Sequence, residues 1–125
     1  MAKKDDRPID VGLAALTGND EAAAIAFWKK RFELIAAIPS DIARVGAMTP
    51  QLRELTRMQN EAERERLTRA RIIAFAQLSP DVQQKIMASR KAAWDVDRPV
   101  LEKDQALVDK ILPTVDASVR SAYPS

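Results

Sequence analysis

The chain has neither histidine nor cysteine among its 125 residues. Without cysteine it can form no disulfide, no thiolate nucleophile and no zinc–thiolate or iron–sulfur site. Without histidine it lacks the side chain that most often acts as a general base near neutral pH and most often binds transition metals. We therefore expect no catalytic residues, no cofactor and no metal site, and we do not expect an independent enzyme.

Glycine is also scarce, and long apolar runs are lacking. The three glycines, at positions 12, 18 and 46, cannot form a phosphate-binding loop. No serine lies in a Gly-x-Ser-x-Gly turn of the kind that carries the nucleophile of many hydrolases. The longest apolar run, at 22–28, is far shorter than the ~20 residues that cross a bilayer. We expect a cytoplasmic protein without a membrane span.

What the sequence does contain is the composition of an ordinary globular protein. Hydrophobic residues make up 46% and charged residues 30%, so a core can form without disulfides or metals. Basic and acidic residues nearly balance, at 20 and 18, and most basic residues have acidic neighbours. The net charge of +2 therefore gives little support to a nucleic-acid partner.

The pattern of apolar residues predicts an all-α fold, because they recur at three- and four-residue steps and nothing alternates with a period of two. We expect a compact helical bundle of four to six helices. Residues 19–122 are expected to form a single helical domain, and residues 1–18 a partly flexible N-terminal arm. Capping residues, prolines and glycines place the helices at about 20–37, 41–45, 50–78, 80–97, 99–112 and 114–122.

The long central helix predicted at about 50–78 is the most informative element. Its start rests on Thr49-Pro50, a capping hydroxyl before a proline at the first helical position. Its middle, at 59–66, is polar nearly all round and offers local ion pairs such as Glu63–Arg66. This polar middle is a solvated stretch of a long helix, a polar layer between associated helices, or a ligand or nucleic-acid surface using Arg64, Arg66, Arg69 and Arg71.

Side chains on the other helices also suggest contacts. Trp28 lies in a wide apolar arc of the first helix, and Arg31 falls between its two apolar stripes. Met87 and Trp94, seven residues apart, lie on the flank of the fourth helix, which suits either core packing or partner docking. Asp104 lies close to the apolar stripe of the fifth helix, so we expect it to pair with a semi-buried arginine such as Arg31, Arg66 or Arg69.

These patterns predict a non-catalytic helical interaction module or accessory subunit. It would bind a protein partner, or a second copy of itself, through helix faces with arginines at the rim. The residues expected to bind the partner are Trp28, Arg31, Arg64, Arg66, Arg69, Met87 and Trp94. The alternative is a small nucleic-acid-binding regulator that uses the arginine-rich part of the long helix and the helix that follows it.

Overall fold

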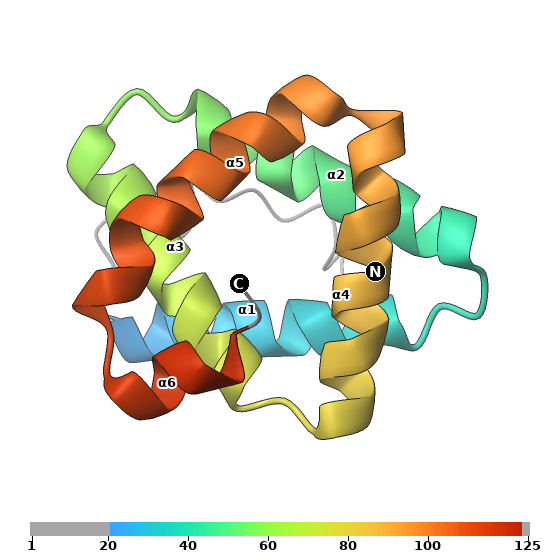
Figure 1. Cartoon of the computed structure of the whole chain (residues 1–125), viewed down its shortest axis with the longest axis horizontal. Coiled ribbons are helices and arrows are strands. Elements are labelled where there is room, and N and C mark those ends of the chain that lie inside the picture. Colours follow the sequence, from blue (N-terminus) through green and yellow to red (C-terminus); the bar gives the residue numbers. More distant parts are fainter. Residues whose placement is uncertain (1–20, 124–125) are drawn as a thin grey trace, which may run out of the picture.

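The structure, a computed structural model, describes residues 21–123, and this part of the chain contains helices and no strands (Figure 1). The all-α fold is therefore confirmed. The predicted arm at 1–18 lies outside the described residues. The elements are α1 (Glu21–Ala36), α2 (Asp41–Arg57), α3 (Glu61–Ala76), α4 (Pro80–Val96), α5 (Arg98–Ile111), the 3-10 turn η4 (Leu112–Thr114) and α6 (Ala117–Ala122).

Helix starts follow the capping chemistry of the sequence where a polar cap and a proline stand together. The Ser79 hydroxyl accepts a hydrogen bond from the backbone N–H of Val82 at 3.3 Å, and Pro80 opens α4. The first, fourth and fifth predicted helices begin and end within one residue of α1, α4 and α5. The last helix, α6, is shorter than the predicted 114–122, because Thr114 belongs to η4 and Val115 is extended.

The long helix predicted at 50–78 is wrong, and so is the short helix predicted at 41–45. One helix, α2, runs through Gly46 and Pro50, and it ends at Arg57. A proline inside a helix removes a backbone hydrogen bond and usually destabilises it. Here tertiary packing outweighs that cost, because α2 buries a stripe at three- and four-residue steps: Val45, Met48, Leu52 and Leu55.

The polar stretch interpreted as the middle of a long helix instead contains the end of the turn between α2 and α3 and the first residues of α3. Met58 leaves the helical region, with ψ at 129°, and Asn60 caps α3 by accepting a hydrogen bond from the Glu63 N–H at 3.0 Å. The Arg64 guanidinium then donates to the Met58 carbonyl at 2.6 Å across the turn. The polar residues thus satisfy the backbone groups that two helix ends leave open.

The Asn60 cap gives a direct test of this turn. Asn60→Ala is expected to lower the free energy of unfolding by about 1 kcal/mol, because the Glu63 N–H then loses its acceptor. Chemical denaturation in urea measures the change. The neighbouring exposed Gln59 makes a matched control, and Gln59→Ala should change stability by less than about 0.5 kcal/mol. Equal losses in the two variants would show that the cap does not hold the turn.

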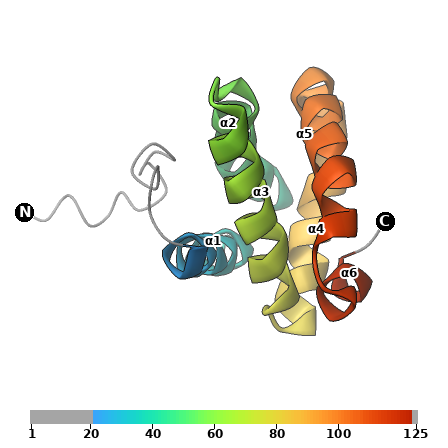
Figure 2. The same ribbon diagram turned by 90° about the vertical axis from the view of Figure 1, so that its left-hand side faces the viewer.

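The helices form two packed layers with α1 across the outside of one of them. Figure 2 shows α2 and α3 in one layer and α4, α5 and α6 in the other. The core between them contains an aromatic row in which Trp28 and Phe32 of α1 approach Phe75 of α3, which in turn packs edge-to-face on Tyr123 at 5.1 Å. Within residues 21–123, no helix has both the length and the apolar character that a membrane crossing requires.

Candidate functional site

The structure places the two α1 candidates inside the protein. Trp28 and Arg31 are each only 2% exposed. The Arg31 guanidinium lies over the Phe27 ring, 4.9 Å from its centre. Part of the wide apolar arc of the first helix is accordingly used for packing, since Trp28, Phe32 and Ile35 are buried. A role of Trp28 and Arg31 in binding a partner stays a prediction, and it would require them to become accessible.

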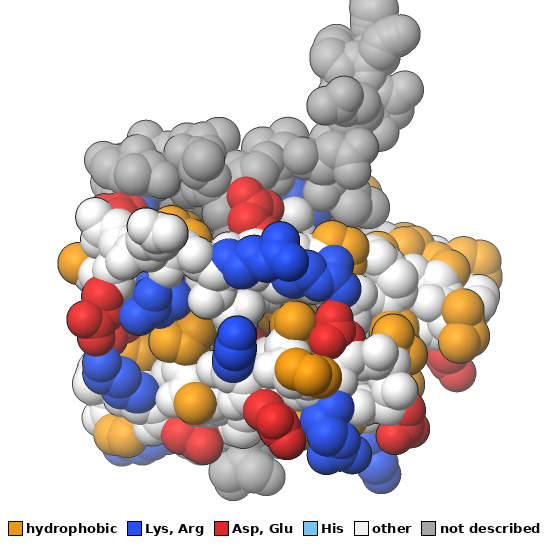
Figure 3. Space-filling view, turned by 90° about the horizontal axis from the view of Figure 1, so that it is seen from above, with side chains coloured by type: hydrophobic (Ala, Val, Ile, Leu, Met, Phe, Trp, Pro, Cys, Tyr) orange, Lys and Arg blue, Asp and Glu red, His pale blue; other side chains and the backbone are white. Residues whose placement is uncertain are grey.

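Two of the three α3 candidates, Arg64 and Arg66, lie in the first half of that helix and make local contacts. The Arg66 guanidinium donates to the Glu63 carboxylate at 2.7 Å, which confirms the predicted Glu63–Arg66 pair, while Arg64 donates to the turn before α3. Arg69 is half-buried one helical turn further on. On the face shown in Figure 3, several lysine and arginine side chains adjoin one another, and acidic and hydrophobic side chains lie around them. The nucleic-acid alternative stays a prediction, and this mixture of charges counts against it.

The two α4 candidates, by contrast, lie together at the surface. Met87 and Trp94 are half-buried on one flank of α4, and the exposed Lys91 lies between them in sequence. The Arg98 guanidinium lies 5.5 Å from the centre of the Trp94 ring, which is a cation–π distance. This flank therefore combines aromatic, thioether and cationic groups, a combination enriched in protein interfaces.

An open groove of about 490 Å³ runs along the same flank. Phe75 of α3, Met87 of α4 and Ala122 of α6 supply apolar lining. The other residues that line the groove are Pro80, Gln83, Gln84, Ala88 and Lys91. Lys91 is the charged residue of this set, and no described carboxylate lines the groove. We define the α4 surface as this groove together with Trp94 and Arg98.

A buried ionic cluster joins α3, α4 and α5. The Asp104 carboxylate, 0% exposed, accepts hydrogen bonds from Arg71 at 2.8 and 3.0 Å and from Arg90 at 2.6 Å. Arg90 also donates to the Gln105 side chain at 3.0 Å. The sequence correctly indicated that Asp104 would pair with arginine, but the partners expected, Arg31, Arg66 or Arg69, are wrong. The periodicity of α4 held a signal for Arg90, which lies between the buried Ile86 and Ala93 on one face.

Electrostatics keep the cluster charged. Burial alone would lower the pKa of the Arg71 guanidinium, but the charge of Asp104 and the nearby Tyr123 oxygen outweigh burial and raise that pKa.

At the surface, Lys110 bridges Glu61 at 3.1 Å and Glu65 at 2.5 Å. The hydrogen bond from Lys110 lowers the pKa of Glu61, and the two glutamates raise the pKa of Lys110.

A second surface pair joins α2 to the start of α5. Arg53 donates to Asp97 at 2.7 Å, and this hydrogen bond lowers the pKa of the Asp97 carboxyl. Asp97 lies directly before α5, where a carboxylate is favourable for the helix dipole. These surface contacts stabilise the ends of helices, and they bring no nucleophile together with a base.

Within residues 21–123, no group of three acidic side chains is arranged so that it could hold a metal ion. No protein-family model, no curated protein and no solved structure matches the chain. Function must therefore be argued from the geometry of this molecule, in which the α4 surface and the buried ionic cluster are the two arrangements with specific chemistry.

Proposed function

We propose that the protein is a non-catalytic helical interaction module that binds an acidic, amphipathic helix of a protein partner along the α4 surface. The observation that carries the proposal is the pairing of Trp94 with Arg98 beside an open groove that contains Met87. Trp, Met and Arg are enriched at protein interfaces, and Trp and Arg dominate binding energies there.

The dimensions of the α4 surface suit a helix as the occupant. From Pro80 to Trp94 the flank extends over 14 residue steps, about 21 Å at the rise of an α-helix. A partner helix of about four turns can lie along this length and place its apolar residues against Met87 and Trp94. The amide side chains of Gln83 and Gln84 supply hydrogen-bond donors and acceptors at the rim.

The charge of the surface favours an acidic partner. Lys91 lines the groove and Arg98 covers Trp94, while no carboxylate lines the groove among the described residues. Glutamates or aspartates on the partner would pair with these cations, which steers association and fixes orientation more than it adds affinity. A basic partner helix would find no counter-charge in the groove.

Selection from a random 16-residue peptide library on the full chain tests the proposal. We expect the enriched peptides to be acidic and amphipathic with a helical period. Trp94→Ala should weaken the best of them by about 30-fold or more, which corresponds to a loss of roughly 2 kcal/mol at an interface hot spot. Isothermal titration calorimetry measures the affinities. Ile42, which is 76% exposed on α2 and outside the groove, provides the control variant Ile42→Ser, which should bind as the wild type does.

Two results would contradict the proposal. Enriched peptides that bind wild type and Trp94→Ala equally would show that the α4 surface is not the docking site. Light scattering that shows a concentration-dependent dimer, abolished by Trp94→Ala, would assign this surface to self-association instead of a foreign helix.

A further inference from the structure

The α4 helix carries a second stripe besides the one that packs in the core. The members of this outer stripe recur at alternating steps of four and three residues: Pro80, Gln84, Met87, Lys91 and Trp94. All of them are exposed or half-buried, and all but Trp94 line the open groove. The buried residues of the same helix are different ones: Ile86, Ser89, Arg90 and Ala93. Steps of four and three are the spacing of a coiled-coil seam, so the outer stripe has the pattern that packs against one further helix.

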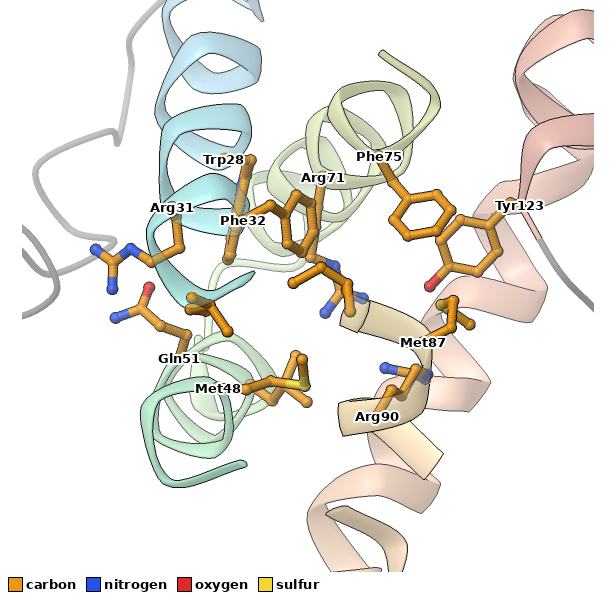
Figure 4. A pocket seen from close by; sticks show the side chains of 13 residues that line it. Trp28, Arg31, Phe32, Met48, Gln51, Arg71, Phe75, Met87, Arg90 and Tyr123 are labelled. Atoms are coloured by element: carbon orange, nitrogen blue, oxygen red, sulfur yellow. The ribbon is translucent and has the colours of Figure 1, made fainter. Parts of the chain in front are cut away.

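Met87 gives the outer stripe an apolar centre that the core supports from behind. Its side chain lines a small cavity in the core as well as the groove. Figure 4 shows Met87 reaching from α4 toward Tyr123, the residue that follows α6. Phe75 and Ala122 add further apolar lining to the groove. A partner helix that lies on the outer stripe therefore contacts a surface that its own packing holds in place.

The polar members of the outer stripe alternate with the apolar ones. Gln84 and Lys91 are separated by Met87, and Trp94 follows Lys91. A polar residue in a helix–helix seam fixes the register, because a shifted partner would cover it without offering a hydrogen-bonding group. No described carboxylate lines the groove, so an acid that pairs with a covered Lys91 must come from the partner.

The cations of the α4 surface lie toward one end of the helix. Lys91 and the Arg98 guanidinium over the Trp94 ring are near the C-terminal end of α4, while Pro80 and Gln84 at the other end are uncharged. A partner helix matches this distribution if its acidic residues gather in one half. The helix dipole favours acidic side chains in the first turn of a helix and disfavours them in the last. The N-terminal half of the partner thus belongs at the Trp94 end.

We infer that the partner helix lies antiparallel to α4 and carries its acidic residues in its N-terminal half, an inference that rests on the proposed function of the α4 surface. Along the partner from its N-terminus, an apolar residue faces Trp94 and a glutamate or aspartate faces Lys91. A second apolar residue then faces Met87, and an amide or hydroxyl side chain faces Gln84. Lys91 and Gln84 determine which partner fits, because a partner without the matching groups leaves them covered and unpaired.

A second copy of the protein fits the outer stripe less well. The stripe contains no carboxylate, so the α4 helix of another copy offers Lys91 no acid in either direction. A parallel copy would also bring the two Lys91 side chains together, and like charges across an interface are unfavourable. Charge complementarity therefore selects an acidic helix of a different protein.

Two synthetic peptides of the same composition test the direction on the full chain. Both have about 16 residues, about four helical turns. Their ends are acetylated and amidated, and they differ only in whether the glutamates lie in the first or the second half. By isothermal titration calorimetry, the peptide with glutamates in its first half should bind about ten-fold more tightly. A nitroxide label near its N-terminus should broaden the Trp94 indole resonance more than a label near its C-terminus does.

Reversal of one charge gives a second readout. Lys91→Glu should weaken the peptide with glutamates in its first half by about ten-fold or more, and lysines in place of those glutamates should restore binding to this variant. Lys85→Glu makes the same change on α4 outside the groove, where Lys85 pairs with Asp81 at 3.8 Å. This control should bind the original peptide within about two-fold of the wild type, because an exposed charge outside the contact is screened by salt.

Three results would overturn this inference and leave the docking function standing. They are stronger broadening of Trp94 by the C-terminal label, equal or tighter binding of the peptide with glutamates in its second half, and equal losses in Lys91→Glu and Lys85→Glu. Failure of both peptides to bind the full chain would contradict the proposed function itself, and the inference with it.

Discussion

Replacing Asp104 by alanine is expected to lower the free energy of unfolding by about 3–5 kcal/mol, one of the two largest effects of a single substitution in this protein. Asp104 is fully buried and accepts three hydrogen bonds from Arg71 and Arg90. Without it, two buried guanidinium groups lie near each other with no shared counter-charge. Their repulsion and the cost of removing them from water both act against folding.

Denaturation in guanidinium chloride or urea, with circular dichroism as the signal, measures the change. Glu102 is an exposed acid on the same helix, and Glu102→Ala should change stability by less than about 0.5 kcal/mol. Asp104→Asn, which keeps the volume of the side chain, should lose most of the stability that Asp104→Ala loses. An Asp104→Ala protein within about 1 kcal/mol of wild type would show that the arginines find another acceptor or reach water.

A variant in which all three charges are removed should behave differently. Arg71→Met, Arg90→Met and Asp104→Leu together are expected to fold, because replacing a complete buried ionic group with apolar side chains is often neutral or stabilising. Comparing the free energy of unfolding of this triple variant with that of Asp104→Ala would separate two quantities. One is the cost of removing a single charge from the cluster, and the other is the net contribution of the whole cluster to stability.

The sequence predicted the helices well where local chemistry and packing agree. At Ser79-Pro80 the cap, the proline and the following apolar stripe all indicate one start, and α4 begins there. At Thr49-Pro50 the same local chemistry was misleading, because the chain on both sides contributes to one buried stripe of α2. Local capping is worth about 1 kcal/mol, and the burial of several large side chains is worth more.

The turn between α2 and α3 carried a signal that the apolar periodicity concealed. Asn60 precedes Glu63 by the spacing of an N-cap and its third helical residue. Neither glycine nor proline marks the turn, and the apolar stripe can be extended across it in heptads. The choice between one long helix and two shorter ones depends on how α3 packs on α1 and α5, which a single helix pattern does not contain.

The candidate sites show the same division between local and tertiary information. The pattern around Asp104 was enough to identify a buried acid, but its partners lie 33 and 14 residues away on two other helices. Which guanidinium reaches the carboxylate depends on the packing of α3 and α4 against α5. Both tryptophans were expected to bind a partner. Trp28 is buried in the aromatic row, whereas Trp94 remains half-exposed under Arg98.

The aromatic row gives the second large effect. Phe75 is 1% exposed, and its ring lies 6.1 Å from the centre of Phe32 and 5.1 Å from that of Tyr123. Phe75→Ala is expected to lower the free energy of unfolding by about 3–5 kcal/mol, because apolar burial is lost and a void remains. Urea denaturation measures this loss. Phe27→Ala, at a half-buried ring on the edge of the row, is the matched control and should lose less.

The position of the void left by Phe75→Ala allows a second test besides the loss of stability. Phe75 lines both a small core cavity, of about 30 Å³, and the groove of the α4 surface, so its truncation is expected to join the two spaces. An apolar void of this kind binds small apolar solutes. Benzene should therefore raise the thermal unfolding temperature of Phe75→Ala and leave that of wild type unchanged, because ligand binding to the folded state alone stabilises it. A Phe75→Ala protein that loses stability but does not respond to benzene would mean that the neighbouring Met87 and Tyr123 collapse into the space.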